Sequence, residues 1–507
     1  MNGKVYLIGA GPGDPGLITV KGLACIQQAD VVIYDYLAAP TLLAHATGEA
    51  EIIYVGKKGS DHTLSQDGIN ALIVEKAMQG KVVARLKGGD PFIFGRGGEE
   101  AEVLVQNGID FEIVPGVTSA IAAPAYAGIP LTHRQFTSTL AFVTGHEDPT
   151  KDETQIDWSA LANGIGTLVF LMGVKNLPNI ARRLIEKGKP PDTPVALVRW
   201  GTTPKQVTVT GTLDTIVDRV KAAGLKAPAI IIVGRVVELR PTLKWFETRP
   251  LMGKTILVTR ARAQASDMVK MLSDLGASCL EYPTIEIVAP DSWEPMDESI
   301  QDLSRYDWLV FTSVNGVKFF FDRLFHSGLD SRALNGIQTA TIGPATEKRL
   351  AGFGVKSDIV PESYRAESII KAFKDKNIDG KRILLPRAAE ARPILPVELT
   401  QMGATVDEIT AYCTRIPESN QDLLLDHLRS KTVDFITFTS SSTVKNFKAL
   451  LPPEQFDDLM DGVTIASIGP ITTDTANALG FDVHIDADPF TIPDLCKAMV
   501  QYSQENG

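Results

Sequence analysis

Long hydrophobic runs are absent from this sequence, and no stretch approaches the ~18 consecutive apolar residues that a membrane-spanning helix needs. We therefore expect no membrane association. Cysteine and histidine are scarce, because the four cysteines lie far apart without a CxxC pair and the seven histidines form no HExxH or HxxxH pair. Neither a disulfide framework nor a zinc site is predicted, and we expect no metal.

Basic residues are in deficit, with 50 lysines and arginines against 61 aspartates and glutamates and a net charge of −11. A nucleic-acid-binding surface needs the opposite balance, so no nucleic-acid partner is expected. The N-terminal residues MNGKVYLIGAGPGDPG pass from Met into a strand-like run and a glycine loop without a small-residue cleavage site. We therefore expect no signal peptide and a cytoplasmic location.

Short runs of Val, Ile and Leu alternate with longer amphipathic stretches, which is the pattern of an α/β protein. The length of 507 residues favours about three compact units. The clearest break falls in 239–253, where two prolines lie between an apolar strand and a new strand at 255–260. We predict two domains, 1–246 and 253–507, joined by a linker at 247–252.

The second half contains an internal repeat. DWLVFTSVNGVKFFFDRL, from Asp307, aligns with DFITFTSSSTVKNFKALL, from Asp434. Downstream, IGPATEKRLAGFG, from Ile342, aligns with IGPITTDTANALG, from Ile468. The period is too long for a solenoid and favours two similar lobes.

Each copy of the repeat places hydroxyl groups where a strand is expected to end and a helix to begin. The four positions are Ser313, Thr346, Ser440 and Thr472. Hydroxyls and free N–H groups at helix N-termini suit carboxylates or phosphates, and a cleft between two lobes is a common ligand site. A single serine or threonine at such a position is usually only a helix cap, but the fourfold repetition favours binding.

The first half gathers small residues at expected strand ends. The strand at 5–8 runs into GAGPGD, but Pro12 and Pro15 interrupt the helix start that a dinucleotide fingerprint requires, so NAD binding is not predicted. RLKGGDPFIFGRGGEE (85–100) and VPGVTSA (114–120) place glycine, serine and threonine next to strands. Such small residues let a ligand approach the backbone closely.

These motifs, together with ADVVIYD, VGKKG, GIPLTHR, FVTGH and FLMGV, resemble those of uroporphyrinogen-III C-methyltransferase, a member of the S-adenosylmethionine (SAM) enzymes that modify tetrapyrroles. The resemblance covers residues 1 to about 245. It implies two α/β subdomains with SAM in the cleft between them, S-adenosylhomocysteine as product, and a homodimer. The SAM contacts that it implies are Pro12, Gly88, Gly89, Asp90, Ile93, Thr118, Ser119, Met172, Gly201 and Ala229.

The resemblance also assigns Asp35 as proton acceptor and Lys57 as proton donor. Methyl transfer from a sulfonium is an in-line displacement that needs alignment rather than a metal. The methylated ring must then lose a proton, which calls for a base such as Asp35. A donor is less needed, and binding of a substrate carboxylate is an equal alternative for Lys57.

The carboxylates of the implied substrate call for cationic residues near these motifs, and Arg96, His133 and Arg134 are the candidates. Arg85 and Lys87 either join them or flank a strand on a solvated face. Tyr36 stands where many members of the family carry an arginine, which puts one carboxylate contact in doubt.

Residues 253–507 resemble uroporphyrinogen-III synthase through VTR, FTSVNGV, IGPAT, LLPRA, AYCT, FTSSSTV and IGPITT. The resemblance implies two α/β lobes and no cofactor. The first lobe would comprise 253–288 and 414–507, and the second 289–413.

The implied reaction closes hydroxymethylbilane to uroporphyrinogen III with loss of water and inversion of the last ring, which demands control of conformation. The matching positions are Ser313, Thr346, Tyr412 and Thr472. The Tyr412 phenol can donate a hydrogen bond to the departing hydroxyl. Alternatively, Tyr412 anchors the crossover between lobes.

The sequence as a whole predicts a bifunctional enzyme. The second half would make uroporphyrinogen III, and the first would methylate it twice, via precorrin-1, to precorrin-2, the branch point for sirohaem and cobalamin. Two alternatives stay open: a methyltransferase for a later corrin intermediate, or a second half that is a non-catalytic tetrapyrrole-binding module.

Overall fold

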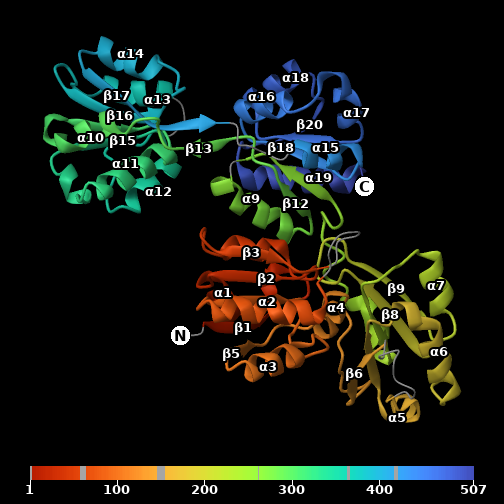
Figure 1. Ribbon diagram of the computed structural model, residues 1–507. Coiled ribbons are helices and arrows are strands. Elements are labelled where there is room, and N and C mark those ends of the chain that lie inside the picture. The colour runs from red at the N-terminus through yellow and green to blue at the C-terminus, as the bar shows by residue number, and fades with distance from the viewer. Residues whose placement is uncertain are drawn as a thin grey trace. The chain divides into compact units, whose positions relative to one another are not determined.

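A computed structural model describes residues 3–56, 64–145, 155–260, 262–361, 366–415 and 421–506. Over these ranges the protein is α/β, as predicted, with four five-stranded sheets (Figure 1). The chain divides between Thr255 and Ile256 into two compact units, the first of which also takes in 270–279 and 500–507. None of the helices in the described ranges has the length and hydropathy of a membrane span.

The first sheet is entirely parallel, with strand order β3-β2-β4-β1-β5. Its elements are β1 (Lys4–Gly9), α1 (Val20–Gln27), β2 (Val31–Tyr34), β3 (Glu51–Tyr54), α2 (Gln66–Met78), β4 (Val83–Lys87), α3 (Gly97–Gln106) and β5 (Asp110–Val114). Because all five strands run the same way, their carboxyl ends and the loops that follow them meet at one edge, where open α/β sheets bind ligands.

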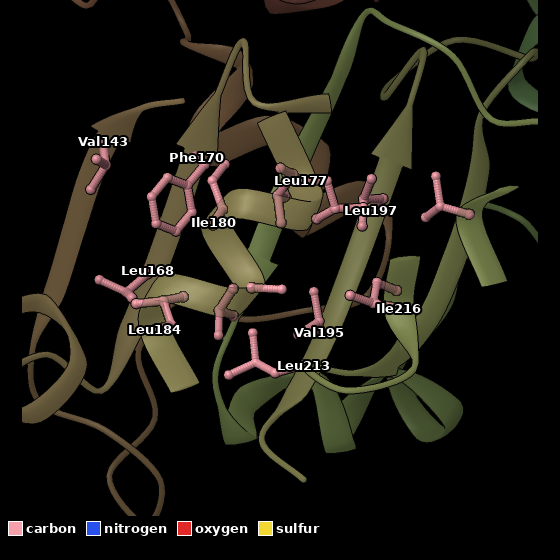
Figure 2. Close-up of a cluster of buried hydrophobic side chains, with 14 of the residues drawn as sticks. Val143, Leu168, Phe170, Leu177, Ile180, Leu184, Val195, Leu197, Leu213 and Ile216 are labelled. Carbon is pink, nitrogen blue, oxygen red and sulfur yellow. The ribbon is translucent and has the colours of Figure 1, made fainter. Parts of the chain in front are cut away.

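The second sheet is mixed, with order β6-β7-β10-β8-β9. Its elements are α4 (Ser119–Tyr126), β6 (Leu140–Thr144), α5 (Trp158–Gly164), β7 (Thr167–Leu171), α6 (Leu177–Glu186), β8 (Pro194–Arg199), β9 (Val207–Thr212), α7 (Ile216–Ala222) and β10 (Ala229–Val233). Helix α6 buries Leu177, Ile180, Ala181 and Leu184, the spacing of one helix face. This face packs against side chains of the sheet, Phe170 among them (Figure 2).

The predicted linker at 247–252 is tied into the first unit. Glu247 Oε1 accepts hydrogen bonds from Gln206 Nε2 at 2.8 Å and from Thr208 Oγ1 at 2.5 Å. The Leu251 side chain is fully buried. Ordered structure therefore continues from α8 (Arg240–Leu243) beyond residue 246, through the turns that precede β11.

The remaining two sheets have the orders β12-β11-β18-β19-β20 and β13-β17-β16-β14-β15. Their strands are β11 (Thr255–Val258), β12 (Ser278–Glu281), β13 (Glu286–Val288), β14 (Trp308–Phe311), β15 (Gln338–Thr341), β16 (Arg382–Ala388), β17 (Thr405–Arg415), β18 (Phe435–Phe438), β19 (Thr464–Ser467) and β20 (Val483–Asp486). The helices are α9 (Arg262–Asp274), α10 (Glu294–Gln301), α11 (Val314–His326), α12 (Pro344–Ala351), α13 (Ala366–Lys374), α14 (Ile394–Gln401), α15 (Gln421–Arg429), α16 (Ser441–Ala449), α17 (Phe456–Met460), α18 (Pro470–Ala478) and α19 (Ile492–Asn506).

The first of these two sheets joins strands from distant parts of the chain, so this lobe is discontinuous, as expected. One boundary needs correction. Strand β13, which we placed at the end of the first lobe, pairs antiparallel with β17 and so belongs to the sheet of the second lobe.

The sequence repeat corresponds to equivalent elements of the two lobes. The succession β14, α11, β15, α12 in one lobe matches β18, α16, β19, α18 in the other. Strand β14 pairs in parallel with β15, as β18 does with β19. Each copy therefore places two helix N-termini after parallel strands, at one edge of its own sheet.

Candidate functional site

A cavity of about 770 Å³ lies at the carboxyl edge of the first sheet, within the range typical of small-molecule sites. Asp35, directly after β2, and Arg85 and Lys87, from the end of β4, line it. Tyr36 and Arg96 contribute further to its wall. The cavity therefore combines one carboxylate with several cationic side chains.

Asp35 is held in place by two contacts. Its Oδ1 accepts a hydrogen bond from the Leu37 backbone N–H at 3.1 Å, and its Oδ2 lies 3.4 Å from Arg85 Nη2. The Asp35 side chain remains 27% exposed. A carboxylate that is oriented by the backbone, balanced by a cation and open to a cavity can accept a proton from a bound molecule.

Arg85 and Lys87 are buried, with residue exposures of 3% and 4%. The solvated-face alternative is therefore wrong for both residues. Alternation along β4 points both side chains to one side of the sheet, where they meet Glu100 of α3. Lys87 Nζ donates to Glu100 Oε1 at 2.6 Å, and Arg85 Nε donates to the same oxygen at 3.4 Å.

The local charges act on Lys87 in opposite directions. Burial, the largest cause, and the nearby Arg85 lower the pKa of Lys87, whereas Glu100 and Asp35 act to raise it, and the net shift is downward. Glu100 itself is fully buried, and its Oε2 has no hydrogen-bond partner among the described residues. The sequence analysis did not identify Glu100. Two cations at alternate positions of an apolar strand are the signal that could have found it, because buried charges need a partner.

Backbone segments approach closely beside this edge. A Cβ added to Gly9 would lie 2.4 Å from the Gly116 Cα and 2.7 Å from the Gly89 carbonyl oxygen. Gly11 and Gly89 exchange backbone hydrogen bonds at 3.2 and 2.7 Å. Only glycine permits this close packing of the three loops.

Asp90 connects the same loops through hydrogen bonds. Its Oδ1 accepts from the Phe92 and Ile93 backbone N–H groups at 2.8 and 3.1 Å, and its Oδ2 accepts from Gly116 N–H at 2.9 Å. Next to Gly116, Thr118 caps the N-terminus of α4 by accepting from Ala120 N–H at 3.3 Å. The structure thus brings together the predicted SAM residues Gly88, Gly89, Asp90, Ile93, Thr118 and Ser119.

The glycine loop after β1 reaches the second sheet of the same unit. The Asp14 backbone N–H donates to Thr202 Oγ1 at 3.0 Å, and Tyr126 donates to Asp14 Oδ2 at 2.7 Å. The predicted residue Pro12 lies in this loop, and Gly201 is packed so closely that a Cβ there would lie 2.4 Å from the Ala123 Cβ. The predicted Ala229 begins β10 and is buried.

Unusual backbone conformations mark these loops. Of the six non-glycine residues with positive φ in the described ranges, five lie in loops of the first unit: Phe94, Arg96, Met172, Trp200 and Thr202. Met172 directly follows β7 and its side chain is 56% exposed. Such strained positions cluster at ligand sites, where the surrounding structure holds them.

Of the remaining predicted residues of the first half, some line the cavity and others do not. Arg96 lines the cavity and pairs with Glu99, its Nη2 lying 2.6 Å from Oε2. His133 and Arg134 are not among the residues that line the cavity, and the His133 ring packs against Phe136 at 5.0 Å. Lys57 lies outside the described residues.

Tyr36 occupies the cavity wall where the resemblance leads one to expect an arginine. Its ring meets Trp200 edge to face, with 6.1 Å between the ring centroids. This position therefore offers an aromatic surface rather than a cation.

In the second unit, Ser313 and Tyr412 lie together. Ser313 caps α11, its Oγ accepting from Gly316 N–H at 2.9 Å, and Tyr412 Oη donates to the same Oγ at 3.1 Å. Tyr412 is 8% exposed, and its ring stacks on Phe319 with 5.8 Å between centroids. A phenol and a hydroxyl thus meet at the carboxyl edge of the second lobe's sheet.

The other three hydroxyl positions occupy equivalent helix starts. Ser440 caps α16 and forms a capping box with Thr443. Thr346 and Thr472 are the third residues of α12 and α18, are buried, and follow Gly343 and Gly469. Helix capping therefore accounts for Ser313 and Ser440 locally, but not for the two threonines.

Arg387, at the end of β16, is a second residue that the sequence analysis did not single out. It is 4% exposed, and its Nη2 donates to the Arg392 carbonyl oxygen at 2.6 Å. Within the described ranges its Nε and Nη1 have no hydrogen-bond partner, although Nη1 lies 3.6 Å from Glu408 Oε1. Burial lowers the pKa of this guanidinium. It stands beside Tyr412, since Ala388 pairs with Tyr412 across the strands.

Comparisons with known proteins agree with this division of the chain. The family model described as Tetrapyrrole (Corrin/Porphyrin) Methylases matches residues 4–217, and that described as Uroporphyrinogen-III synthase HemD matches residues 266–497. A porphyrin biosynthesis protein HemD of Ruminiclostridium josui is 37% identical over 505 residues, which cover 100% of this chain and 99% of the relative.

Two relatives match the first half alone. A uroporphyrinogen-III C-methyltransferase of Priestia megaterium is 59% identical over 235 residues, covering 46% of this chain and 98% of the relative. An S-adenosyl-L-methionine-dependent uroporphyrinogen III methyltransferase of Methanosarcina barkeri is 54% identical over 241 residues, covering 48% of this chain and 94% of the relative.

Proposed function

We propose, from the premise that this chain belongs to the tetrapyrrole methylases in its first half and to the uroporphyrinogen-III synthases in its second, that it is an enzyme of tetrapyrrole biosynthesis with two activities. The second half cyclises hydroxymethylbilane to uroporphyrinogen III, with loss of water and inversion of the last ring. The first half methylates uroporphyrinogen III twice, via precorrin-1, to precorrin-2 for sirohaem or cobalamin.

The observation that carries the methyltransferase proposal is the cavity that places Asp35 beside cationic side chains at the carboxyl edge of the first sheet. The substrate is a polycarboxylate that must lose a proton after methylation. Asp35 accepts this proton, while Arg96, half-exposed on the cavity wall, supplies positive charge for the substrate carboxylates.

The glycine loops next to the cavity fit SAM as methyl donor. A Cβ at Gly9 or Gly116 would fill the space between these loops, and Gly89, Asp90 and Thr118 surround the bare backbone there. SAM, when bound, supplies an electrophilic methyl group and leaves as S-adenosylhomocysteine. The chain aligns the two reactants and excludes water from between them.

In the synthase half, Tyr412 donates a hydrogen bond to the departing hydroxyl of the bilane. Its phenol is already oriented by Ser313 Oγ at 3.1 Å, so little reorganisation is needed. Thr346, Ser440 and Thr472 contribute hydroxyls at helix N-termini for the substrate carboxylates. These groups fix the conformation in which the last ring inverts. No cofactor is required for this step.

We also propose an oligomeric state and a cellular location. The enzyme forms a homodimer through its first half and works in the cytoplasm.

Each activity is tested with its own substrate. Purified protein given uroporphyrinogen III and SAM is expected to yield a doubly methylated product by mass spectrometry, and hydroxymethylbilane without SAM is expected to yield the type III isomer by chromatography. Failure to methylate uroporphyrinogen III, with methylation of a later corrin intermediate, would reassign the first half. Only the type I isomer would make the second half a tetrapyrrole-binding module.

A further inference from the structure

Four charged side chains at and next to the methyltransferase cavity, Asp35, Arg85, Lys87 and Glu100, are unevenly bonded. Glu100 Oε1 lies 2.6 Å from Lys87 Nζ but 3.4 Å from Arg85 Nε. Arg85 Nη2 lies at the same 3.4 Å from Asp35 Oδ2, and Arg85 Nη1 donates to the Leu86 carbonyl oxygen at 2.7 Å. The close ion pair is thus Lys87–Glu100, and Arg85, anchored at Leu86, is shared between the two carboxylates at equal distance.

This sharing depends on how much of the Glu100 charge Lys87 neutralises. Glu100 is fully buried, so its negative charge acts over a short range in a medium of low dielectric constant. Its other donor is a neutral amide, Gln66 Nε2 at 3.2 Å. Without the Lys87 ammonium, Arg85 would be the one described cation within ion-pair distance of Glu100, since Arg96 acts on Glu100 only at longer range. The guanidinium would then shift its contact from Asp35 toward Glu100.

We propose that Lys87 is a positioning residue of the methyl-transfer site, which binds Glu100 and thereby keeps Arg85 on the proton acceptor Asp35. The inference rests on the proposed function, because it takes Asp35 as the base. Lys87 acts through Glu100 and Arg85 rather than on the reacting atoms. It thereby keeps a cation beside the carboxylate that accepts the proton.

Among the described residues, the other ionisable side chains near Asp35 are tyrosines and one paired arginine. Tyr34 precedes Asp35 on β2, Tyr36 follows it, and Tyr54 lies on the neighbouring β3. Burial, helped by Tyr34, Asp35 and Tyr36, raises the pKa of Tyr54 above its ordinary value of 10.0. At the rim, Arg96 is paired with Glu99.

The test is the pH dependence of kcat for methylation of uroporphyrinogen III with SAM in two opposed variants. In Lys87→Met, Glu100 draws Arg85 away from Asp35, and the acidic limb is expected to move up by about one pH unit. In Glu100→Gln, Asp35 is the one carboxylate of the cluster left for Arg85, and the acidic limb of kcat is expected to move to lower pH. The double variant leaves one cation for one carboxylate, and its activity at neutral pH is expected to be several-fold above that of Lys87→Met.

Glu102→Gln, the same substitution at an exposed site of α3, is the matched control and keeps the wild-type profile. Limbs that move in the same direction, or a double variant no more active than Lys87→Met, would overturn the inference in favour of a purely structural role. If Lys87→Met fails to fold, Lys87→Gln gives the same comparison. If Asp35→Asn keeps the acidic limb, the assignment of Asp35 as base fails instead, and with it the premise.

Discussion

Asp35 belongs to a cluster in which charges occur in equal numbers, the carboxylates of Asp35 and Glu100 and the buried cations of Arg85 and Lys87. Breaking such a set by removing one member leaves a buried charge without its partner, which costs more than the pair contributes. The site therefore tolerates changes at Asp35, its most exposed member, better than changes at Glu100. A substitution at Asp35 is therefore expected to affect the methyl-transfer rate more than the stability of the fold.

Asp35→Asn preserves shape and removes the base. We expect kcat for methyl transfer to fall by about 100-fold or more, with SAM affinity retained, because a positioned general base contributes about that much. Stopped-time assays with uroporphyrinogen III and a calorimetric titration with SAM check both parts. Asp110→Asn, at the exposed start of β5, is the control. A variant that keeps its rate would contradict the assignment.

Tyr412→Phe removes the hydrogen bond to Ser313 Oγ and the proposed donor to the leaving hydroxyl, but keeps the ring stacked on Phe319. We expect the synthase rate to fall about tenfold, or ~1.4 kcal/mol in the barrier, with the type III isomer still the main product. Isomer-resolved chromatography measures both quantities. Complete loss of activity in a folded variant would be incompatible with an assisting role.

At the scale of elements, the loops that leave β1, β4 and β5 are held together by backbone contact at glycine. Gly9→Ala would place a methyl group 2.4 Å from the Gly116 Cα, so we expect a loss of about 1–3 kcal/mol in the free energy of unfolding and weaker SAM binding. Gly98→Ala, where a Cβ meets nothing within 4 Å, is the matched control and is expected to stabilise α3 slightly. Denaturant unfolding and SAM titration compare the two, and equal behaviour would refute the close-packing argument.

Elements with a strong pattern could be predicted from the sequence, and those set by tertiary contacts could not. The repeat located β14 and β18 with their following helices, because apolar runs ending at a Ser N-cap carry their own local signal. Strand β13 has three residues and forms only by pairing with β17, so nothing local assigned it to the right lobe.

The candidate site shows the same division. Asp35 and the glycine loops could be found because they follow strands, whereas Arg85 and Lys87 remained undecided. Their burial depends on Glu100. This residue lies in the next helix along the sequence, and its Oε1 comes into contact with Lys87 Nζ only in the folded protein. A charged residue's environment follows from packing across elements, which a single sequence does not display.

At the scale of the whole molecule, each unit carries its own candidate site. The cavity with Asp35 is built from residues of the first unit, and the Ser313–Tyr412 pair from residues of the second. The two activities should therefore respond independently, with Asp35→Asn leaving cyclisation unchanged and Tyr412→Phe leaving methylation of supplied uroporphyrinogen III unchanged. Assaying both reactions in both variants checks this, and loss of both reactions in either variant would contradict it.

The most direct test of the account is one incubation of the whole chain with hydroxymethylbilane and SAM, followed by mass spectrometry and isomer-resolved chromatography. We predict a doubly methylated product of the type III series, since the product of the second half is the substrate of the first. Formation of only the type I isomer, methylated or not, or of type III that stays unmethylated, would contradict the proposal that one chain carries both activities.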